Sequence, residues 1–192
     1  MFKPCFVPLD IQTFIENKLG KPVEFFGKSG HTSDQLIGEQ GIIHDFLKKE
    51  NREIVFLSLG QNDLSKIDLS EFHPDIAAQA LGESISNKVG MLGVNYPGIK
   101  FILLPLSLRN MSQFLNPHWP QNHDPLFVNR CNEIIRKIFM HFSVHAGNVW
   151  FINPSFLHQA HEAAMLTEAD GLHLNEVGKK IVVHETIRQI LF

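Results

Sequence analysis

Short apolar segments alternate along this chain with longer segments of helical periodicity, and this alternation constrains the fold more than any other feature. The clearest short segment is IVFLSL at 54–59, which is continuous, rich in β-branched and aromatic residues, and closed by Gly60. Strands separated by helices form βαβ units, whose strands lie parallel and are covered by helices on both faces. The pattern predicts a three-layer α/β/α domain with a parallel sheet of four or five strands. Four of these strands are visible at 23–26, 54–59, 99–104 and 149–152.

The helical segments are recognised by their apolar stripes and by the residues at their ends. We expect helices at about 10–19, 33–50, 75–92, 127–142 and 175–191. The second is weakened by Gly38 and Gly41, because glycine costs about 1 kcal/mol relative to alanine inside a helix. Two stretches are expected to be irregular, a polar loop at 61–74 and a longer segment at 106–126. Residues 1–192 are expected to form a single domain.

Composition and charge limit the partners and the compartment. Lys and Arg total 17 against 20 Asp and Glu, a net charge of −3, so a broad nucleic-acid-binding surface is not expected. Apolar residues make up 44% of the chain and charged residues 19%, which is typical of a protein with a folded core. The two cysteines, Cys5 and Cys131, are too few for a disulfide scaffold or a thiolate zinc site. No apolar run reaches the roughly 18 residues of a membrane span, and the first ten residues make a poor signal peptide, so a soluble, cytoplasmic protein is expected.

The residues that follow the strands carry the candidate chemistry, because ligands of such sheets bind beyond the carboxyl ends of the strands. Gly30 follows the first visible strand and can present a backbone N–H, and Asn62 follows the second and can present an amide N–H. Two such donors aimed at one point would stabilise an oxyanion. Asp170 lies three residues before His173, close enough in a turn to hold the imidazole Nδ1–H and leave Nε2 free as a base. These four residues predict a site for acyl transfer.

Three sequence blocks resemble those of the SGNH, or GDSL-type, hydrolases, a family of esterases and acyl hydrolases on a flavodoxin-like sheet. GKSGHTSDQL resembles the second block, LSLGQNDLS the third block G-x-N-D, and DGLHLNEVGKKI the fifth block D-x-x-H. The resemblance implies that Gly30 and Asn62 form an oxyanion hole, that Asp170 and His173 act as acid and base, and that no metal or organic cofactor is needed. It also implies a small ester or acyl ligand as the partner. PGIKFILLPLSLRN and FVNRCNEIIRKI further resemble the esterase-like domains of some animal retrotransposons.

The first block of the family, a G-D-S that ends the first strand and carries the nucleophilic serine, does not occur in the sequence. Residues 1–9 are a poor substitute, because Pro4 and Pro8 would each remove a hydrogen bond from a central strand. The family's first strand lies between the strands expected at 23–26 and 54–59, so its loss is expected to leave both with unpaired edges inside the sheet. Two accounts remain open. In one the chain is N-terminally incomplete and its serine lies upstream, and in the other the protein is an inactive relative.

Other nucleophiles have weaker support. Ser29 adjoins the oxyanion glycine, but the nucleophile is required on the neighbouring strand, within reach of the base nitrogen, so Ser29 is a weak candidate. Cys5 is expected to pack as a small hydrophobic residue. Without a nucleophile the same cleft would serve a non-catalytic binding module, or pseudoenzyme, that holds an acyl or lipid-like ligand.

The histidines are not expected to bind a metal. His141 and His145 are four residues apart, but this segment lacks the glutamate and the third ligand of an HExxH zinc site. His158 and His161 are likewise expected to be surface residues or to have protein partners. Four apolar residues around the long irregular segment are candidates for the lining of an acyl pocket: Phe114, Leu115, Trp119 and Phe127.

Overall fold

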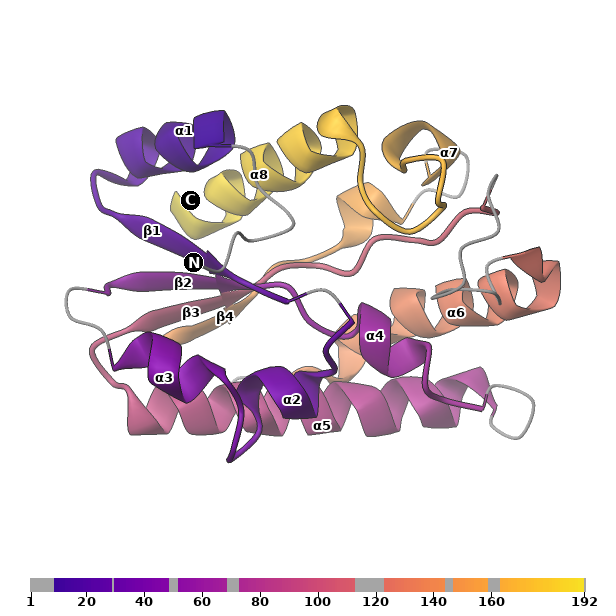
Figure 1. Ribbon diagram of the computed structural model, residues 1–192, viewed down its shortest axis with the longest axis horizontal. Coiled ribbons are helices and arrows are strands. Elements are labelled where there is room, and N and C mark those ends of the chain that lie inside the picture. The colour runs from indigo at the N-terminus through magenta and orange to yellow at the C-terminus, as the bar shows by residue number, and fades with distance from the viewer. Residues whose placement is uncertain are drawn as a thin grey trace.

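The computed structural model confirms an α/β fold built on a parallel sheet. It describes residues 9–28, 30–48, 52–68, 73–112, 123–143, 147–158 and 163–191. Within these residues the sheet has four strands, β1 (Val23–Phe26), β2 (Ile54–Leu57), β3 (Lys100–Leu103) and β4 (Val149–Phe151). The strands lie in the order β1-β2-β3-β4 and are all parallel (Figure 1). Each strand falls inside a segment predicted from the sequence.

β1 and β2 pair directly with each other, which corrects one expectation. Val23 pairs with Ile54 and Phe26 with Leu57, in continuous parallel register. The prediction that these two strands would have unpaired edges inside the sheet is therefore wrong. The physical reason is that a gap would bury N–H and C=O groups without partners, whereas direct pairing satisfies them.

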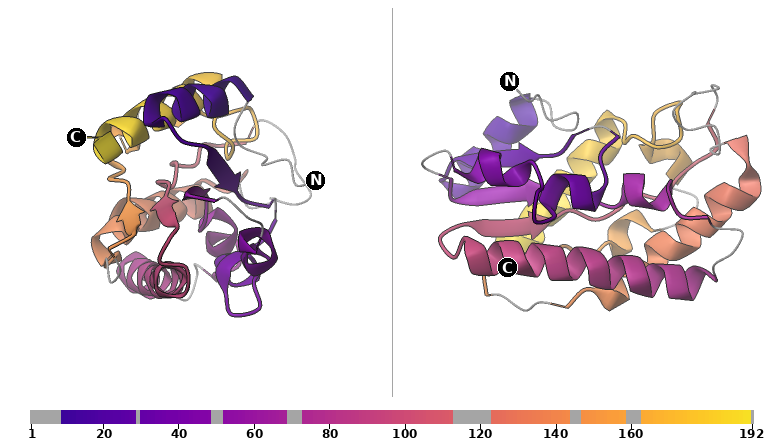
Figure 2. Two further views of the ribbon diagram at one scale, coloured as in Figure 1. Left: turned by 90° about the vertical axis from the view of Figure 1, so that its left-hand side faces the viewer. Right: turned by 60° about the horizontal axis from the view of Figure 1, so that its bottom comes forward.

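The order of the strands decides where the helices lie. Because the sheet grows in one direction along the chain, right-handed crossovers place the connecting helices on one face. That face carries α2 (Ser33–Ile37), α3 (Ile43–Leu47), α5 (Pro74–Asn95) and α6 (Pro125–Ile138). The opposite face is covered by α1 (Leu9–Leu19) and α8 (Glu176–Leu191), and Figure 2 shows the three layers from the end of the sheet. The shorter elements are α4 (Gln61–Leu64), the 3-10 helices η2 (Phe139–His141) and η3 (Ser155–Leu157), and α7 (Ala163–Leu166).

Each face of the sheet buries its own hydrophobic cluster, since successive strand residues point to opposite faces. Phe56 and Ile102 belong to the cluster beneath α1 and α8, whereas Val55 and Phe101 belong to the cluster beneath α5 and α6. The stripe predicted on α5 is buried along its whole length: Ala78, Leu81, Ile85, Val89 and Leu92. Burial of a large aliphatic side chain contributes about 1.5–3 kcal/mol, so these clusters hold the three layers together.

The single helix expected at about 33–50 is wrong, because the structure has two short helices there, α2 and α3. Gly38 and Gly41 lie in the turn between them and press against the backbone of α2. A Cβ on Gly38 would lie 2.5 Å from the carbonyl oxygen of Asp34, and one on Gly41 would lie 2.5 Å from that of Leu36. Only glycine permits this approach, and the cost of glycine inside a helix favours the break.

The segment after β2, expected to be a polar loop, begins with the short helix α4. Gly60 precedes this helix with a φ of 102°, a left-handed conformation that favours glycine. Asn62 and Asp63 therefore lie on a helical turn, which fixes the directions of their side chains.

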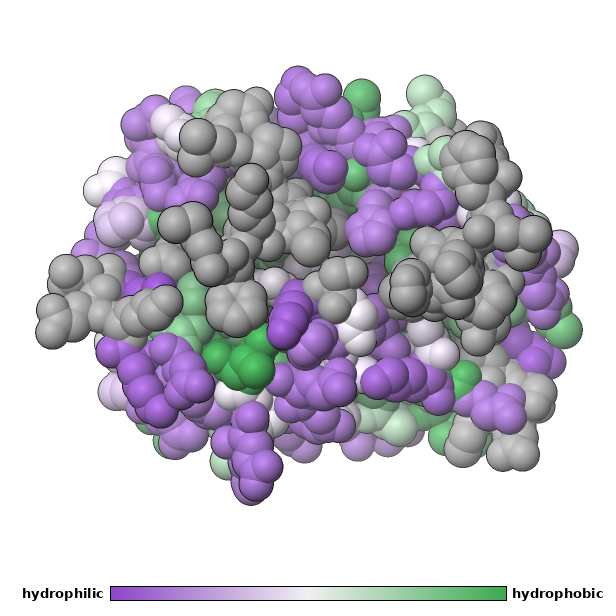
Figure 3. Space-filling model, in the orientation of Figure 1, coloured by the Kyte–Doolittle hydropathy of each residue, from purple (hydrophilic) through white to green (hydrophobic). Residues whose placement is uncertain are grey.

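No helix in the described part of the chain is long and apolar enough to cross a membrane. Figure 3 shows that the described surface on one side of the molecule is mainly hydrophilic. The exposed large hydrophobic residues are spread over several helices, with Ile76 on α5, Met140 on η2 and Val177 on α8 among them.

Candidate active site

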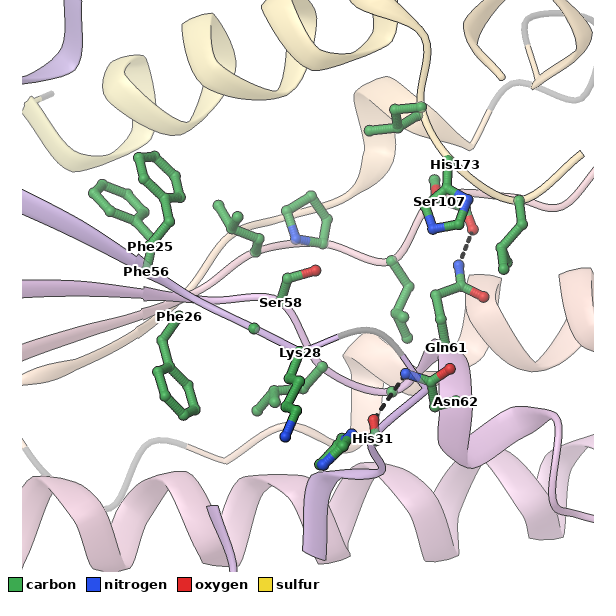
Figure 4. Close-up of a pocket in the computed structure, with 18 of the residues that line it drawn as sticks. Phe25, Phe26, Lys28, His31, Phe56, Ser58, Gln61, Asn62, Ser107 and His173 are labelled. Atoms are coloured by element: carbon green, nitrogen blue, oxygen red, sulfur yellow. Dashed lines mark hydrogen bonds between the residues drawn. The ribbon is translucent and has the colours of Figure 1, made fainter. Parts of the chain in front are cut away.

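A pocket of about 100 Å³ lies beyond the carboxyl ends of β1, β2 and β3, at the edge of the sheet where a ligand site was predicted (Figure 4). Its wall is formed by the segments that follow these strands, by the turn before α8 and by α8 itself. One part of the wall is apolar and includes Phe25, Phe56, Leu104 and Val182. The polar residues of the wall are Lys28, Gly30, His31, Ser58, Gln61, Asn62, Ser107 and His173. The pocket thus brings together three of the four predicted site residues, and the fourth, Asp170, is bonded to His173.

Asp170 and His173, the predicted acid and base, lie in one tight turn. Asp170 Oδ1 accepts hydrogen bonds from the backbone N–H of Leu172 at 2.9 Å and of His173 at 3.0 Å. Asp170 Oδ2 lies 2.5 Å from His173 Nδ1. Gly171 makes the turn possible with a φ of 69°. The carboxylate is therefore held by the backbone of the same turn that carries the imidazole.

The charge on Asp170 decides the proton arrangement of His173. Burial acts to raise the pKa of Asp170, but the hydrogen bonds from the His173 side chain and from two backbone N–H groups outweigh it and hold the pKa below its ordinary value of 3.8. An ionised carboxylate only accepts hydrogen bonds, so Nδ1 of neutral His173 carries the proton and Nε2 is left with a free lone pair. This is the tautomer that a general base requires.

Asn62 reaches the pocket from α4. Its Nδ2 donates one hydrogen bond, at 2.8 Å, to the carbonyl oxygen of His31, which follows Gly30 in the loop after β1 (Figure 4). An amide nitrogen has two hydrogens, and this bond uses one of them. Among the described residues no acceptor binds the second hydrogen, which can serve a ligand oxygen.

Asp63 fixes α4 against α2. Its carboxylate accepts a hydrogen bond of 2.6 Å from the Ser33 hydroxyl and further bonds of 3.0 and 3.1 Å from the Ser33 backbone N–H. Ser33 is 1% exposed, so these bonds to a charged acceptor lie in the interior. The Asp of G-x-N-D is thus a structural residue that joins the second sequence block to the third.

Gly30 lies in the pocket wall with a φ of 75°. A Cβ at this position would meet no atom within 4 Å, so the glycine is favoured by its backbone conformation and not by crowding. Ser29, the weak candidate for the nucleophile, lies outside the described residues, as does Cys5.

Two hydroxyl side chains line the described part of the pocket, those of Ser58 and Ser107. Ser58 follows β2, and Ser107 lies in the segment that follows β3. His173 Nε2 has no hydroxyl or thiol bonded to it among the described residues.

Several pocket residues were missed by sequence reasoning, namely Lys28, His31, Ser58, Gln61 and Ser107. Their signal was position alone, since each lies within about five residues of a strand end. Nothing in their spacing distinguishes them from ordinary loop residues, so they could not be singled out from the sequence.

The other candidate residues lie apart from the pocket wall or outside the described residues. Phe127 packs against the guanidinium of Arg109, with its ring centroid 5.5 Å from the guanidinium carbon. The remaining predicted lining residues, Phe114, Leu115 and Trp119, lie outside the described residues. No group of three or more metal-ligating side chains occurs in the described part of the chain, and the second histidine of each closely spaced pair, His145 and His161, lies outside it.

His158 packs beside the segment that follows β3. Burial lowers its pKa, and Nε2 lies 3.3 Å from the carbonyl oxygen of Leu106. A neutral imidazole can donate one hydrogen bond to such a carbonyl, so His158 has a protein partner, as expected for a packed histidine.

Comparison with known proteins identifies the family of the chain. The model of the family described as GDSL-like lipase/acylhydrolase matches residues 6–186. No curated protein matches the chain. A solved structure described as "a putative platelet activating factor from Streptococcus pneumonia" is similar at 15% identity, over 95% of this chain and 92% of that one, with a TM-score of 0.49. The family match spans nearly the whole sequence, and the chain belongs to the GDSL-like lipase/acylhydrolase family, which confirms the SGNH resemblance of its motifs.

Proposed function

We propose that this protein has the site of an ester hydrolase, with His173 as the general base, Asp170 as its orienting acid, and Gly30 and Asn62 as the oxyanion donors. The observation that carries the proposal is the Asp170–His173 pair, whose imidazole lines the same pocket as Asn62 and Gly30. A base and amide donors around one cavity are the requirements of acyl transfer.

The chemistry follows from the positions of the groups. A serine hydroxyl would attack the ester carbonyl while His173 Nε2 takes its proton. The carbonyl oxygen would become an oxyanion and accept hydrogen bonds from the second hydrogen of the Asn62 amide and from the Gly30 N–H. His173 would then give its proton to the leaving alcohol, and Asp170 would stabilise the imidazolium. Water would hydrolyse the acyl-enzyme by the same route.

For the 192-residue chain we propose little or no ester turnover. The support is that no described hydroxyl is bonded to His173 Nε2, although Ser58 and Ser107 line the same pocket. A nucleophile must lie within about 2.6–3.2 Å of its base to be activated.

The test is hydrolysis of p-nitrophenyl acetate by the full chain, by His173→Ala and by a control variant, His184→Ala. His184 is an exposed histidine of α8, with 74% of its side chain accessible, so its loss leaves the pocket unchanged. We expect all three proteins to hydrolyse the ester near the background rate. Robust turnover that His173→Ala abolishes and His184→Ala preserves would contradict the proposed loss of activity and establish the enzyme. Labelling by a fluorophosphonate, followed by peptide mass spectrometry, would then identify the serine.

A non-catalytic binding module is the second candidate, and the apolar part of the pocket supports it. Phe25 and Phe56 stack with their ring centroids 4.8 Å apart and line the pocket together with Leu104 and Val182. Such a wall can hold an acyl chain without any chemistry. Binding of butyrate, followed by NMR, that disappears in Val182→Asp and survives in His173→Ala would support this role. Binding that is absent from the unaltered chain would exclude it for short acyl ligands.

A further inference from the structure

The segment 107–110, which follows β3, contacts both halves of the candidate site. On one side Gln61 Nε2 donates a hydrogen bond of 2.7 Å to the carbonyl oxygen of Ser107. On the other side the backbone N–H of Asn110 donates one of 2.8 Å to the carbonyl oxygen of Gly171. Gln61 precedes the proposed donor Asn62, and Gly171 lies between the proposed acid and base. One short segment is therefore bonded to both functional parts of the pocket.

Arg109 adds three side-chain hydrogen bonds between this segment and residues 61 and 65. Its side chain is buried, and its Nη2 donates to the carbonyl oxygen of Gln61 at 2.7 Å and to the Ser65 hydroxyl at 2.9 Å. Its Nε donates to Gln61 Oε1 at 3.1 Å. Gln61 is the first residue of α4 and Ser65 follows its last residue. The guanidinium is therefore bonded to both ends of the helical turn that carries Asn62. Because the guanidinium is planar and presents several N–H groups in fixed directions, these bonds define an orientation as well as a distance.

The segment itself is anchored to α6, so it can act as a fixed support. Asn132 accepts a hydrogen bond of 2.7 Å from the backbone N–H of Arg109 and donates one of 2.8 Å to its carbonyl oxygen. Both bonds are buried, and Asn132 is 9% exposed. The turn of the acid and base is pressed against the same support, since a Cβ on Gly171 would lie 2.1 Å from the carbonyl oxygen of Asn110.

We propose that the segment 107–110 sets the position of the oxyanion donor relative to the base, and that Arg109 is the positioning residue that holds Asn62 in place. The proposal rests on the function proposed above, since it assigns Asn62 a role in binding the oxyanion. Arg109 itself acts through α4, because every bond from its guanidinium described above ends on that helix or on Ser65 at its end. It is distinct from the acid, the base and the donors.

The experiment measures Asn62 directly and needs no turnover. The side-chain amide signals of Asn62 are recorded by NMR in the full chain and assigned by their loss in Asn62→Ala. Arg109→Met removes the guanidinium, and Gln61→Met removes the bridge between Arg109 and Ser107 at a half-buried position where folding is less at risk. We expect both variants to move the Asn62 amide signals toward those of a solvent-exposed asparagine, as its bond to the His31 carbonyl is lost.

Two further variants separate positioning from general destabilisation. Ser86→Ala removes a partly buried hydrogen bond of 2.7 Å to the carbonyl oxygen of Ser143, and since neither residue lines the pocket, it is expected to leave the Asn62 signals unchanged. Arg109→Lys keeps a charged donor but lacks the planar set of N–H groups of the guanidinium. Its Asn62 signals should therefore lie between those of the unaltered chain and those of Arg109→Met. Unchanged Asn62 signals in both Arg109→Met and Gln61→Met, with the proteins folded, would overturn the proposal.

The test of Arg109 can be distinguished from the test of the proposed ester hydrolase. If no ester turnover depends on His173, as proposed for this chain, and the Asn62 signals still move in Arg109→Met, the positioning role stands without any turnover. If His173-dependent turnover is found, Arg109→Met should lower kcat by about 100-fold with little change in KM, the effect expected of a misplacement of about 1 Å. An unchanged kcat would then contradict the proposal for Arg109 and leave the hydrolase intact.

Discussion

The two halves of the candidate site are built in different ways. The turn of Asp170 and His173 is held by hydrogen bonds between residues two or three positions apart. The donor side is held by bonds that span 31 residues from Asn62 to His31, 30 from Asp63 to Ser33, and 48 from Arg109 to Gln61. The Asp170–His173 pair is therefore joined by bonds within one turn, whereas Asn62, the proposed oxyanion donor, is held by contacts between segments far apart in the sequence.

This difference predicts which half of the site is more sensitive to substitutions elsewhere in the fold. The bonds that Asp170 forms with Leu172 and His173 depend on the residues of the turn itself, and the bond from Asn110 to the Gly171 carbonyl oxygen joins this turn to the rest of the fold. The donor side loses its geometry when any of several packed segments moves. Mutations that loosen the fold should then disturb Asn62 before they disturb the Asp170–His173 pair.

The largest loss of stability is expected from Gly171→Ala, which changes the turn between Asp170 and His173. The new Cβ would require a left-handed backbone in a residue that disfavours it and would lie 2.1 Å from the carbonyl oxygen of Asn110. We expect a loss of roughly 2–5 kcal/mol in the free energy of unfolding, measured by urea denaturation. Gly98→Ala is the matched control, because a Cβ there meets no atom within 4 Å and its stability should change by less than about 0.5 kcal/mol. Equal stability of the two variants would show that the turn is not held against Asn110.

A smaller loss of stability is expected from Asp63→Asn, which weakens the Asn62 side of the site. The substitution removes the charge that accepts bonds from the Ser33 N–H and hydroxyl, and places an NH₂ group beside those donors. The free energy of unfolding should fall by about 1.5–3 kcal/mol, the usual value for a hydrogen bond to a charged group. Asp34→Asn is the control, because the side chain of this neighbouring acid is 77% exposed and forms an ion pair with Lys88, so its loss should cost less than about 1 kcal/mol. The contrast between the halves would be weakened if both variants lost the same stability.

Asp170→Asn tests the local half through its dependence on pH. The pKa of Asp170 is lower in the folded protein than its ordinary value of 3.8, so its ionised form stabilises the fold above that pH, and this contribution is lost as the pH falls through the folded value. In urea denaturation the unaltered protein should exceed Asp170→Asn by about 1–2 kcal/mol at pH 7, and the gap should narrow below about pH 4. Glu39→Gln, at an exposed position, is the control and should change the stability at pH 7 by less than about 0.5 kcal/mol. A gap that stays constant down to pH 2.5 would contradict the role of the ionised carboxylate.

The same distinction explains how much the sequence predicted. The D-x-x-H turn and the buried strand of residues 54–57 were predictable, because their signals lie within a few neighbouring residues. The G-x-N-D motif predicted that Asn62 faces the pocket, but it did not predict that Asp63 binds Ser33, since neither residue carries a sign of its partner.

Features that depend on distant partners were not predictable from one sequence. The direct pairing of β1 with β2 depends on which strand edges meet in the folded sheet, and the motif order suggested a gap there. The burial of Arg109 was hidden for the same reason, because an arginine in an irregular segment is usually exposed. The break at Gly38 and Gly41 was indicated by composition, but its cause, the close approach to the backbone of α2, is a property of the fold.

The smallest effect is expected from Gln35→Ala, which removes a contact between close neighbours on the Asn62 side of the site. Gln35 Oε1 accepts a hydrogen bond of 3.0 Å from the Thr32 backbone N–H and so caps α2, next to the carbonyl of His31 that binds Asn62. The loss of this exposed cap should cost about 0.5–1 kcal/mol in urea denaturation. Since Ser33 remains bound to Asp63, the start of α2 should stay in place and the Asn62 amide signals should not move. A shift of those signals would show that a local cap also holds Asn62. Asn62 would then not depend on distant contacts alone, which would contradict the contrast drawn with the Asp170–His173 turn.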